Sequence, residues 1–413
     1  MNDDLTPVII TGARTPFGKF RGSLSSVQVN DLGAHAIAAA LERSGVPAEN
    51  IGHVIVGQVI LAGAGQGPAR QAAIKAGIGW NVPTVTVNKL CLSGLTAVID
   101  AARMIRCGEA DFIIAAGQES MSNAPHLVRG MRSGLAIGDR GMEDSLNYDG
   151  LADPFSGELM GSATDRGNIE RGIPRAEQDA FAAASHQRAA AARETLNAEI
   201  APISIPQRRG EDLVVAQDEG IRPDTTAEQL SALRPAFSKD PDATITAGSS
   251  SPLSDGAAAL VIASKGAARR AGLDWLCEIG SHGQTAGPDG SLHSQPSDSI
   301  VAALAKEGLK ASDLDLIEIN EAFASVVLQS AKDLGLDPSS INREGGAIAL
   351  GHPVGASGAR LVLHQAMELA RRGKGVGVVA LCGGGGQGDA LILRAGFHTW
   401  LSGHIQRTHS LVS

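Results

Sequence analysis

Two cysteines and one histidine of this chain lie in turns made of small residues. Cys91 is part of the segment VNKLCLSGL, His352 of GHPVGASG and Cys382 of VALCGGGGQG. A thiol can serve as a nucleophile, and an imidazole or a second thiol can carry a proton at neutral pH. Together these groups indicate acyl transfer through a thioester, followed by the making or breaking of a carbon–carbon bond.

The position of Cys91 distinguishes it from an ordinary buried cysteine. It follows a β-branched run, 84–87, and comes just before a helix expected to begin near Ser93. The first turn of a helix offers free N–H groups and a positive dipole end, which favour a thiolate and can stabilise an oxyanion. We therefore predict that Cys91 is the nucleophile. Cys107, at a helix end, and Cys277, in a β-rich run, are predicted to be inert.

The glycines after Cys382 match G-x-G-x-x-G, the pattern of a dinucleotide-binding turn. That turn must open a helix and be followed by an acidic residue about 20 positions later. Here 389–394 alternates like a strand, and the patterned chain ends soon afterwards. We therefore predict a glycine hairpin that brings backbone N–H groups and Cys382 close to a ligand.

His352 and Asn320 are the remaining candidates. His352 lies between Gly351 and Pro353, five residues before an expected helix. Asn320 follows a strand-like run, 316–319. Its alternative role is a helix N-cap, with Glu321 in the first turn. The pattern of residues leaves both roles of Asn320 open.

The composition is that of a soluble globular protein. The 413 residues are 43% hydrophobic and 19% charged, and the net charge of −9 argues against a nucleic-acid partner. The four cysteines have no C-x-x-C spacing, so no metal site is predicted. No signal peptide or membrane-spanning run is visible in the sequence. We therefore expect a cytoplasmic protein with reduced thiols and no membrane partner.

Short β-branched runs alternate with alanine-rich helices in both halves of the chain. The pair SG at 93–94 begins a helix that ends at Gly108, and a strand follows at 112–116. The pair SG at 357–358 begins a helix that ends at Gly373, and a strand follows at 376–381. The alternation predicts an α/β layered fold with a mostly parallel sheet. The repeated order predicts an internal duplication.

The interval from about 122 to 251 fits neither half. It is rich in Gly, Met, Asp and Pro, and it contains one clear helix, 175–197, after Pro174. Inserts of this kind commonly carry substrate contacts. The expected domains are an N-terminal half (1–121 plus 252–275), an inserted loop domain (122–251), a C-terminal half (276–396) and a tail (397–413) without assigned function.

Four motifs give the chain a specific resemblance to a known family. NKLC at 88–91, NEAF at 320–323, GGAIALGHP at 345–353 and CGGG at 382–385 together resemble the thiolases, closest to the acetyl-CoA C-acetyltransferases. The resemblance implies two duplicated βαβαβ-type halves that form a layered αβαβα core with an inserted loop domain. The implied reaction is the condensation of two acetyl-CoA to acetoacetyl-CoA and CoA, or the reverse thiolysis of a 3-ketoacyl-CoA.

The resemblance also implies a role for each matching residue. Cys91 is the acylated nucleophile, and His352 activates it and helps to bind a thioester oxygen. Cys382 removes a proton from the α-carbon of the second acyl-CoA. Asn320 holds a water in the second oxyanion hole, and the backbone N–H groups of Cys91 and Gly384 form the first.

CoA contacts are expected mainly from the inserted loop domain. The implied positions are Leu151, Met160, Arg222, Phe237, Ala247, Ser251, Ala322 and Phe323. Arg222 is the candidate for a CoA phosphate, with an exposed surface arginine as the alternative. No tightly bound cofactor is expected, because CoA and acyl-CoA are substrates, and the expected assembly is a homotetramer, a dimer of dimers.

Two departures from the family pattern bear on the substrate. Leu92 occupies a position that is usually small, which predicts an altered acyl pocket, and Leu159 stands where a histidine is common near the pantetheine. A longer-chain, degradative thiolase is therefore the alternative. A β-ketoacyl synthase is disfavoured by the CGGG turn at 382–385, and a catalytically silent binding subunit by the intact set of Cys91, His352 and Cys382.

Overall fold

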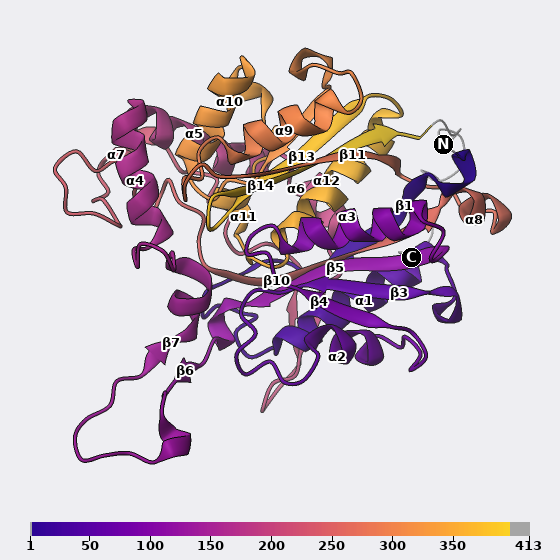
Figure 1. The fold of residues 1–413 in the computed structure, drawn as a ribbon, viewed down its shortest axis with the longest axis horizontal. Coiled ribbons are helices and arrows are strands. Elements are labelled where there is room, and N and C mark those ends of the chain that lie inside the picture. Colours follow the sequence, from indigo (N-terminus) through magenta and orange to yellow (C-terminus); the bar gives the residue numbers. More distant parts are fainter. Residues whose placement is uncertain (1, 397–413) are drawn as a thin grey trace.

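The computed structural model describes residues 2–396 of the chain. Its centre is a ten-stranded mixed sheet with the order β12-β13-β14-β11-β1-β10-β5-β3-β4, and β2 (Gly18–Lys19) pairs with β10. The tail predicted at 397–413 lies outside the described residues. Figure 1 shows the N-terminal half and the C-terminal half as two neighbouring bodies joined along this sheet.

The N-terminal half contains five main strands and three helices. β3 pairs in parallel with β4 and β5, whereas β10 pairs antiparallel with both β5 and β1. The elements are β1 (Pro7–Arg14), α1 (Val29–Ser44), β3 (His53–Gly57), α2 (Pro68–Lys75), β4 (Thr84–Val87), α3 (Ser93–Arg106), β5 (Phe112–Ser120) and β10 (Ser254–Ser264).

The C-terminal half repeats this order of elements except at the place of β4, where only an isolated parallel bridge joins Ile317 and Ile341. β12 pairs in parallel with β13, β13 and β14 pair antiparallel, and β14 pairs antiparallel with β11. β1 pairs with β11 at the junction of the halves, so the predicted duplication is confirmed. The elements, after the short helix α8 (Lys265–Arg270), are β11 (Cys277–Ala286), α9 (Gln295–Ala305), β12 (Leu316–Ile319), α10 (Ala324–Leu334), α11 (Ala347–Leu350), α12 (Ser357–Arg372), β13 (Val376–Gly383) and β14 (Gln387–Ala395).

Five layers result from the way the helices cover the sheet. α3 and α12 pack against each other and against strands of both halves, and their apolar residues form one buried cluster with the inner faces of those strands. α1 and α2 cover the outer face of the N-terminal half, and α9 and α10 cover the other half. The predicted αβαβα core is therefore confirmed. Because α3 and α12 share the central layer, their N-terminal turns are brought to the same end of the core.

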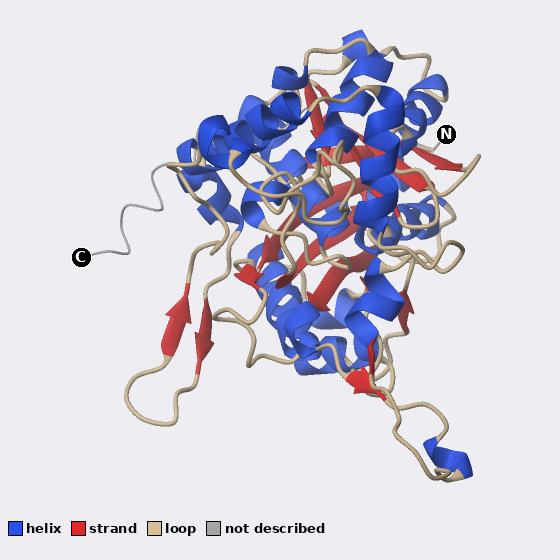
Figure 2. Cartoon of the chain, turned by 90° about the vertical axis from the view of Figure 1, so that its left-hand side faces the viewer, coloured by secondary structure: helices blue, strands red, loops and turns tan. Residues whose placement is uncertain are grey.

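The inserted segment between β5 and β10 contains the elements that belong to neither half. Two hairpins project from the body in Figure 2: one contains β6 and β7, and the other β8 and β9. The elements are β6 (His126–Leu127), β7 (Glu143–Asp144), a π-helix (Leu146–Leu151), α4 (Met160–Arg171), α5 (Arg175–Ala191), α6 (Arg193–Glu199), β8 (Ile203–Ile205), β9 (Leu213–Val215) and α7 (Ala227–Ser231).

Two expectations about local structure are wrong. The sheet is mixed rather than mostly parallel, because the antiparallel partners of β5 and β13 are also apolar runs buried on both faces. The helix expected at 175–197 is interrupted at Ala192 and is accompanied by α4 and α7. The β-branched run at 84–87 forms β4, a partly exposed strand at the edge of the sheet.

Candidate active site

A strained turn presents Cys91 between β4 and α3. Leu90 has a φ of 52°, a left-handed conformation that is costly for a branched side chain. The Leu90 carbonyl accepts hydrogen bonds from both the backbone N–H and the hydroxyl of Ser93, at 2.9 and 2.6 Å. Lys89 fixes the turn to β14 through an ion pair with Asp389. The predicted place of Cys91, between a strand and a helix, is confirmed.

Burial determines the protonation state of the Cys91 thiol. Burial raises the pKa of Cys91 to about 11, although the backbone N–H groups of Cys91 and Gly384 act in the opposite direction on the sulfur. The nearby N–H groups thus favour the thiolate in the expected direction, but loss of hydration outweighs them. Cys91 needs a base.

His352 has the tautomer of a base. Its Nδ1 lies 2.6 Å from the Ser357 hydroxyl oxygen, and that hydroxyl donates to the Pro353 carbonyl at 3.0 Å. Nδ2 of Asn320 can only donate and lies 3.4 Å from Nε2 of His352, so Nε2 keeps its lone pair and Nδ1 donates to the Ser357 oxygen. Burial, together with the charge of Arg360, lowers the pKa of His352 to about 4. The imidazole is thus neutral at pH 7 and able to accept a proton.

Cys382 is the last residue but one of β13, and a glycine-rich hairpin connects this strand to β14. Cys382 pairs with Gly388 across this hairpin, so the predicted strand after the glycines is confirmed. The backbone of Gly386 lies so close to the carbonyl oxygen of Asp289 that a Cβ atom on residue 386 would be only 1.8 Å from that oxygen. Burial, and next the neighbouring Cys91, raise the pKa of the Cys382 thiol well above its usual range.

Asn320 and Glu321 have different tasks. α10 begins at Ala324, and its cap is Phe323, so Asn320 is not the helix cap. The Asn320 Nδ2 lies 3.4 Å from Nε2 of His352, inside the protein. The carboxylate of Glu321 accepts hydrogen bonds from Ser185, Asn342 and the backbone of Ile348. Glu321 therefore ties α5 and α11 to the turn that carries Asn320.

One apolar cavity of about 140 Å³ receives all three reactive groups. Cys91, His352 and Cys382 line it, together with Gly384. Six of the predicted CoA contacts line it as well: Leu151, Met160, Phe237, Ser251, Ala322 and Phe323. The rings of Phe237 and Phe323 meet edge to face, with centroids 5.8 Å apart. The sequence motifs and the inserted segment thus converge on one site.

Three residues that were predicted to contact the substrate do not line the cavity. Arg222 and Ala247 are exposed and do not line the cavity; the Arg222 guanidinium lies 3.1 Å from Nε2 of His186. Leu92 is fully buried among the apolar residues between α3 and β13 and also lies outside the cavity. The prediction that Leu92 alters the acyl pocket is therefore unsupported, because its side chain packs behind Cys91. Leu159, in contrast, does line the cavity.

Other residues of the site were missed by sequence reasoning. Glu119 is fully buried and accepts hydrogen bonds from the backbone N–H groups of Val59, Ile60 and Gly355; burial raises its pKa to about 7. It joins the turn after β3 to the turn that follows His352. Only its charge in an apolar strand could have signalled this role. Seven further residues that line the cavity were not predicted, because their types indicate no chemistry: Met121, Gly161, Ser250, Pro252, Leu253, Leu292 and Val354.

Within residues 2–396, no helix is long and apolar enough to cross a membrane. Nor do the His, Cys, Asp and Glu side chains of this part form a group able to hold a metal ion. All four cysteines are free.

A two-half α/β core with reactive groups at paired helix starts is the architecture of a thiolase-type acyltransferase. The thiolase N-terminal domain matches residues 7–266, and the thiolase C-terminal domain matches residues 273–395. The chain therefore belongs to the thiolase family, as the sequence motifs predicted.

Curated relatives cover nearly the whole chain. A probable acetyl-CoA acetyltransferase of Mycolicibacterium smegmatis is 56% identical over 94% of this chain and 100% of its own length. One from Mycobacterium tuberculosis is 55% identical over 95% of this chain and 100% of its own length. An acetyl-CoA acetyltransferase of Pseudomonas aeruginosa is 46% identical over 94% of this chain and 98% of its own length.

Proposed function

We propose that this thiolase is an acetyl-CoA C-acetyltransferase, which condenses two acetyl-CoA to acetoacetyl-CoA and CoA and catalyses the reverse thiolysis. The observation that carries the proposal is the meeting of Cys91, His352 and Cys382 in one apolar cavity. The names of the relatives support the acetyl-CoA substrate. CoA and acyl-CoA are substrates in this proposal, and no tightly bound cofactor takes part.

The first half-reaction transfers an acetyl group to Cys91. Nε2 of His352 takes the thiol proton, and the sulfur attacks the thioester carbonyl. The developing oxyanion accepts hydrogen bonds from the backbone N–H groups of Cys91 and Gly384, which already act on the sulfur. The leaving CoA thiolate takes the proton of Cys382. The products are acetyl-Cys91, free CoA, a Cys382 thiolate and a His352 imidazolium.

The second half-reaction forms the carbon–carbon bond. The Cys382 thiolate removes an α-proton from a second acetyl-CoA, and the His352 imidazolium and a water held by Asn320 stabilise the enolate oxygen. The α-carbon attacks the acetyl carbonyl on Cys91, and the Cys91 thiolate leaves and takes the proton of His352. Cys91, His352 and Cys382 thereby return to the protonation states from which the reaction began. The opposite charges of His352 and Cys382 between the steps make each ion less costly in an apolar cavity.

Substitution of the two thiols separates the two steps. Cys91→Ala should form no acyl-enzyme. Cys382→Ala should still form some when given acetyl-CoA, but should condense it about 10²–10⁴-fold more slowly or worse. The measurements are the mass of the trapped acyl-enzyme and the rate of acetoacetyl-CoA formation. Cys107→Ala, at an exposed thiol, is the control that should leave both unchanged. Acetylation of the Cys91→Ala protein, or normal condensation by Cys382→Ala, contradicts the assignment.

The acyl chain length is inferred from the relatives and from one cavity residue. The names of the relatives support activity on acetoacetyl-CoA. Leu159 lines the cavity, whereas Leu92 faces the core. We infer thiolysis of acetoacetyl-CoA with some tolerance for longer 3-ketoacyl chains. Thiolysis of 3-ketoacyl-CoA substrates over a range of chain lengths tests this. A protein that cleaves long chains and leaves acetoacetyl-CoA intact is instead the longer-chain, degradative enzyme.

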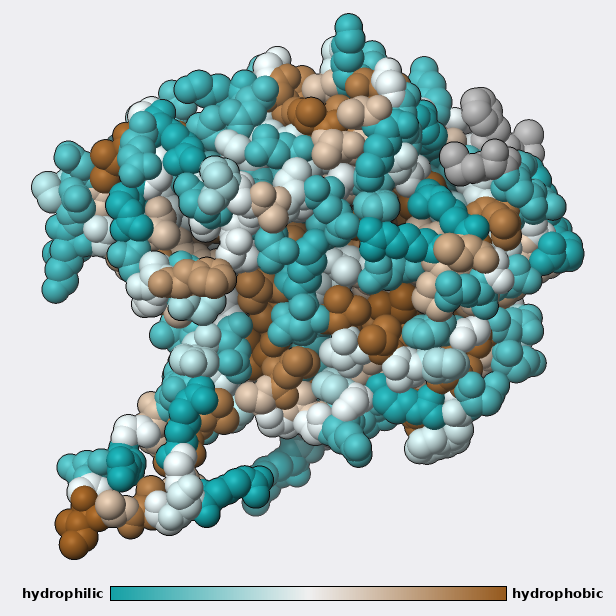
Figure 3. Space-filling model, viewed as in Figure 1, coloured by the Kyte–Doolittle hydropathy of each residue, from teal (hydrophilic) through white to brown (hydrophobic). Residues whose placement is uncertain are grey.

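We further propose a homotetramer built as a dimer of dimers. The edge strand β4 leaves Val85 exposed, and Trp80 beside it is 77% exposed. The arm that contains β6 and β7 carries exposed apolar side chains, and Figure 3 shows them gathered at its tip. An unpaired strand edge and an apolar arm are two separate surfaces that another copy of this chain can cover.

We also propose that the protein is cytoplasmic. The free state of its four cysteines supports this location.

A further inference from the structure

Three buried side chains of β12, its extension and α12 have polar atoms that make no hydrogen bond within the described part of the chain. Arg360 is 1% exposed, and its Nε, Nη1 and Nη2 atoms all lack a partner there. The same holds for Oε2 of Glu318 and Oδ1 of Asn320. An unpaired buried donor or acceptor typically costs about 1–3 kcal/mol, and more when it is charged. A set of unpaired donors beside unpaired acceptors therefore indicates that something links them.

The topology places these groups in one layer. Glu318 and Asn320 are two positions apart along β12 and its extension, so they share a face of the strand. On α12, Arg360 follows Ser357 by one turn, and Ser357 contacts His352. Asn320 contacts the other nitrogen of the same imidazole. Burial has the largest influence on the pKa of both Glu318 and His352, and the charge of Arg360 acts on both, after that of His364 in the case of Glu318. Arg360 thus lies behind the pair formed by Asn320 and His352.

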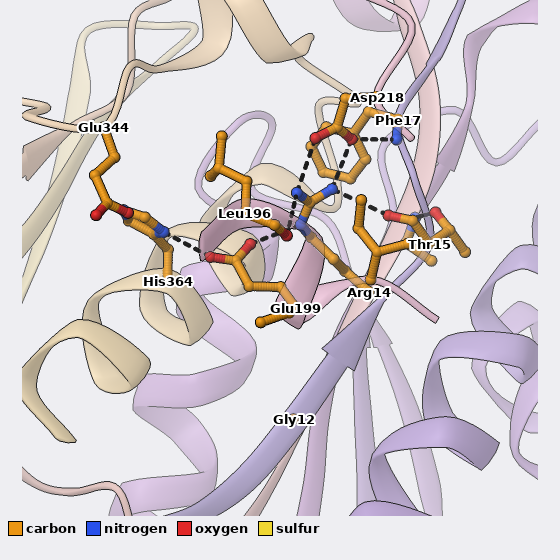
Figure 4. Close-up of polar contacts among 12 residues, drawn as sticks. Gly12, Arg14, Thr15, Phe17, Leu196, Glu199, Asp218, Glu344 and His364 are labelled. Atoms are coloured by element: carbon orange, nitrogen blue, oxygen red, sulfur yellow. Dashed lines mark hydrogen bonds and ion pairs between the residues drawn. The ribbon is translucent and has the colours of Figure 1, made fainter. Parts of the chain in front are cut away.

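A neighbouring ion network does not account for Arg360. Figure 4 shows Arg14 between Glu199 and Asp218, with Glu199 continuing to His364. Arg14 donates to both carboxylates at 2.7 Å, so its guanidinium is satisfied. Arg360 forms no ion pair with any of these residues within 4 Å. Burial lowers the pKa of Arg360, and among the neighbouring charges Glu318 opposes this most strongly and Glu199 next, so the unpaired N–H donors of Arg360 have Glu318 as their main carboxylate neighbour.

We propose that Arg360, through internal water, holds the Asn320 amide in one orientation. The water accepts from the guanidinium and donates to Oδ1 of Asn320, which leaves Nδ2 facing His352 and the oxyanion water of the second half-reaction. Glu318 is the counter-ion of Arg360. Arg360 is then a positioning residue, since it acts through Asn320 and does not touch substrate. This inference rests on the proposed function.

The orientation matters because the two ends of an amide have opposite character. An N–H end supports a water that donates to an enolate oxygen, whereas an oxygen end repels that charge. Without the guanidinium, Asn320 can turn its oxygen towards the site. The first half-reaction depends on the N–H groups of Cys91 and Gly384 instead. Loss of Arg360 should therefore slow condensation far more than acetylation of Cys91.

The test compares Arg360→Met with Arg360→Lys, which restores a cationic donor. We expect Arg360→Met to lower the kcat of condensation about 10- to 100-fold, with an unchanged KM and a nearly normal rate of Cys91 acetylation. Arg360→Lys should recover part of the loss. Gln365→Met is the matched control: it removes a buried hydrogen bond from α12 to the Leu316 carbonyl and should leave the ratio of the two rates unchanged.

A second measurement keeps the inference testable if Arg360→Met does not fold. In an Asn320→Ala background, Arg360→Lys should have no further effect on condensation, because its route through Asn320 is gone. Equal slowing of both half-reactions, or a full additional loss in that background, overturns the inference. A wild-type protein that fails to acetylate Cys91 overturns the proposed function itself, so the two failures are distinguishable.

Discussion

At the scale of single residues, the chemistry depends on which nitrogen of His352 carries a proton. Asn320 and Ser357 decide this together, because Nδ2 of Asn320 donates towards Nε2 and the Ser357 oxygen accepts from Nδ1. The arrangement leaves Nε2 unprotonated in a cavity where burial disfavours the imidazolium. Two side chains that do not themselves react thus select the basic nitrogen.

Ser357→Ala should lower kcat about 10- to 100-fold with little change in KM, the usual cost of losing a group that orients a catalytic residue. Ser357→Thr keeps the hydroxyl and should recover part of the activity. Steady-state kinetics and the rate of Cys91 acetylation provide the measurements. Unlike the loss expected for Arg360→Met, this loss should affect acetylation as well as condensation, because Nε2 takes the Cys91 proton. A Ser357→Ala enzyme with wild-type kinetics contradicts the tautomer argument.

Residue types and turn signals were enough to predict where the reactive groups lie along the chain. Cys91, His352 and Cys382 stand in glycine- and proline-containing turns, and such turns follow local rules. The protonation state of Cys91 could not be predicted in this way. It depends on burial by apolar side chains from distant segments, such as Met121 and Val354, and these carry no chemical signature in the sequence.

At the scale of elements, the duplication explains why Cys91 and His352 meet. Each stands just before the central helix of its half, and α3 packs on α12. The repeated Ser-Gly starts and glycine stops revealed this from the sequence. The direction of strand pairing was not revealed, because a buried antiparallel strand such as β10 is as continuously apolar as a parallel one. The break between α5 and α6 was also missed, because no glycine or proline marks it.

A buried ion network joins β1, α6 and α12, three elements from different parts of the chain. Arg14 and His364 both contact Glu199. Burial acts to raise the pKa of Glu199, but these two cations overcome it and lower the pKa to about 2 from an ordinary 4.5. The pKa of His364 is raised by Glu199 despite burial. Residues separated by up to 185 positions gave no local signal of this contact.

Glu199→Gln should destabilise the protein near pH 5.5 by an amount at the lower end of the about 3–5 kcal/mol typical of breaking a buried ion pair, since His364 loses its nearest carboxylate whereas Arg14 keeps Asp218. The contribution of Glu199 is complete above its ordinary pKa of 4.5 and is lost as pH falls through that value towards 2. That of His364 is complete below 6.5 and is lost as pH rises through its higher folded value. The difference in Tm from wild type should therefore be larger at pH 5.5 than at pH 3.5.

Thermal unfolding at these two pH values is the measurement. Asp31→Asn is the control, because its partner Lys75 is 47% exposed and Asp31 itself 46%; an exposed pair contributes about 0–1 kcal/mol. If Glu199→Gln shifts Tm by the same small amount as Asp31→Asn, or equally at both pH values, the network does not stabilise the fold through its charges.

At the scale of the whole molecule, an open strand edge and a projecting arm both expose apolar side chains. β4 ends the sheet with an open strand edge near Val85, and the arm around β6 and β7 extends Ile137 away from the body. A continuous strand edge suits pairing between two copies, whereas an extended arm suits contact between pairs. The two surfaces should therefore act at different levels of the proposed assembly.

Charge placed on each surface separates these levels. Wild-type protein should have the mass of four chains by light scattering after size exclusion. Ile137→Asp should give two chains, and Val85→Asp should give single chains or a strongly concentration-dependent mass, since a buried unpaired charge is costly at an interface. Val301→Asp, on the outer helix α9 and 55% exposed, should remain a tetramer. A wild-type monomer contradicts the assembly, and a tetrameric Ile137→Asp protein shows that the arm does not join the dimers.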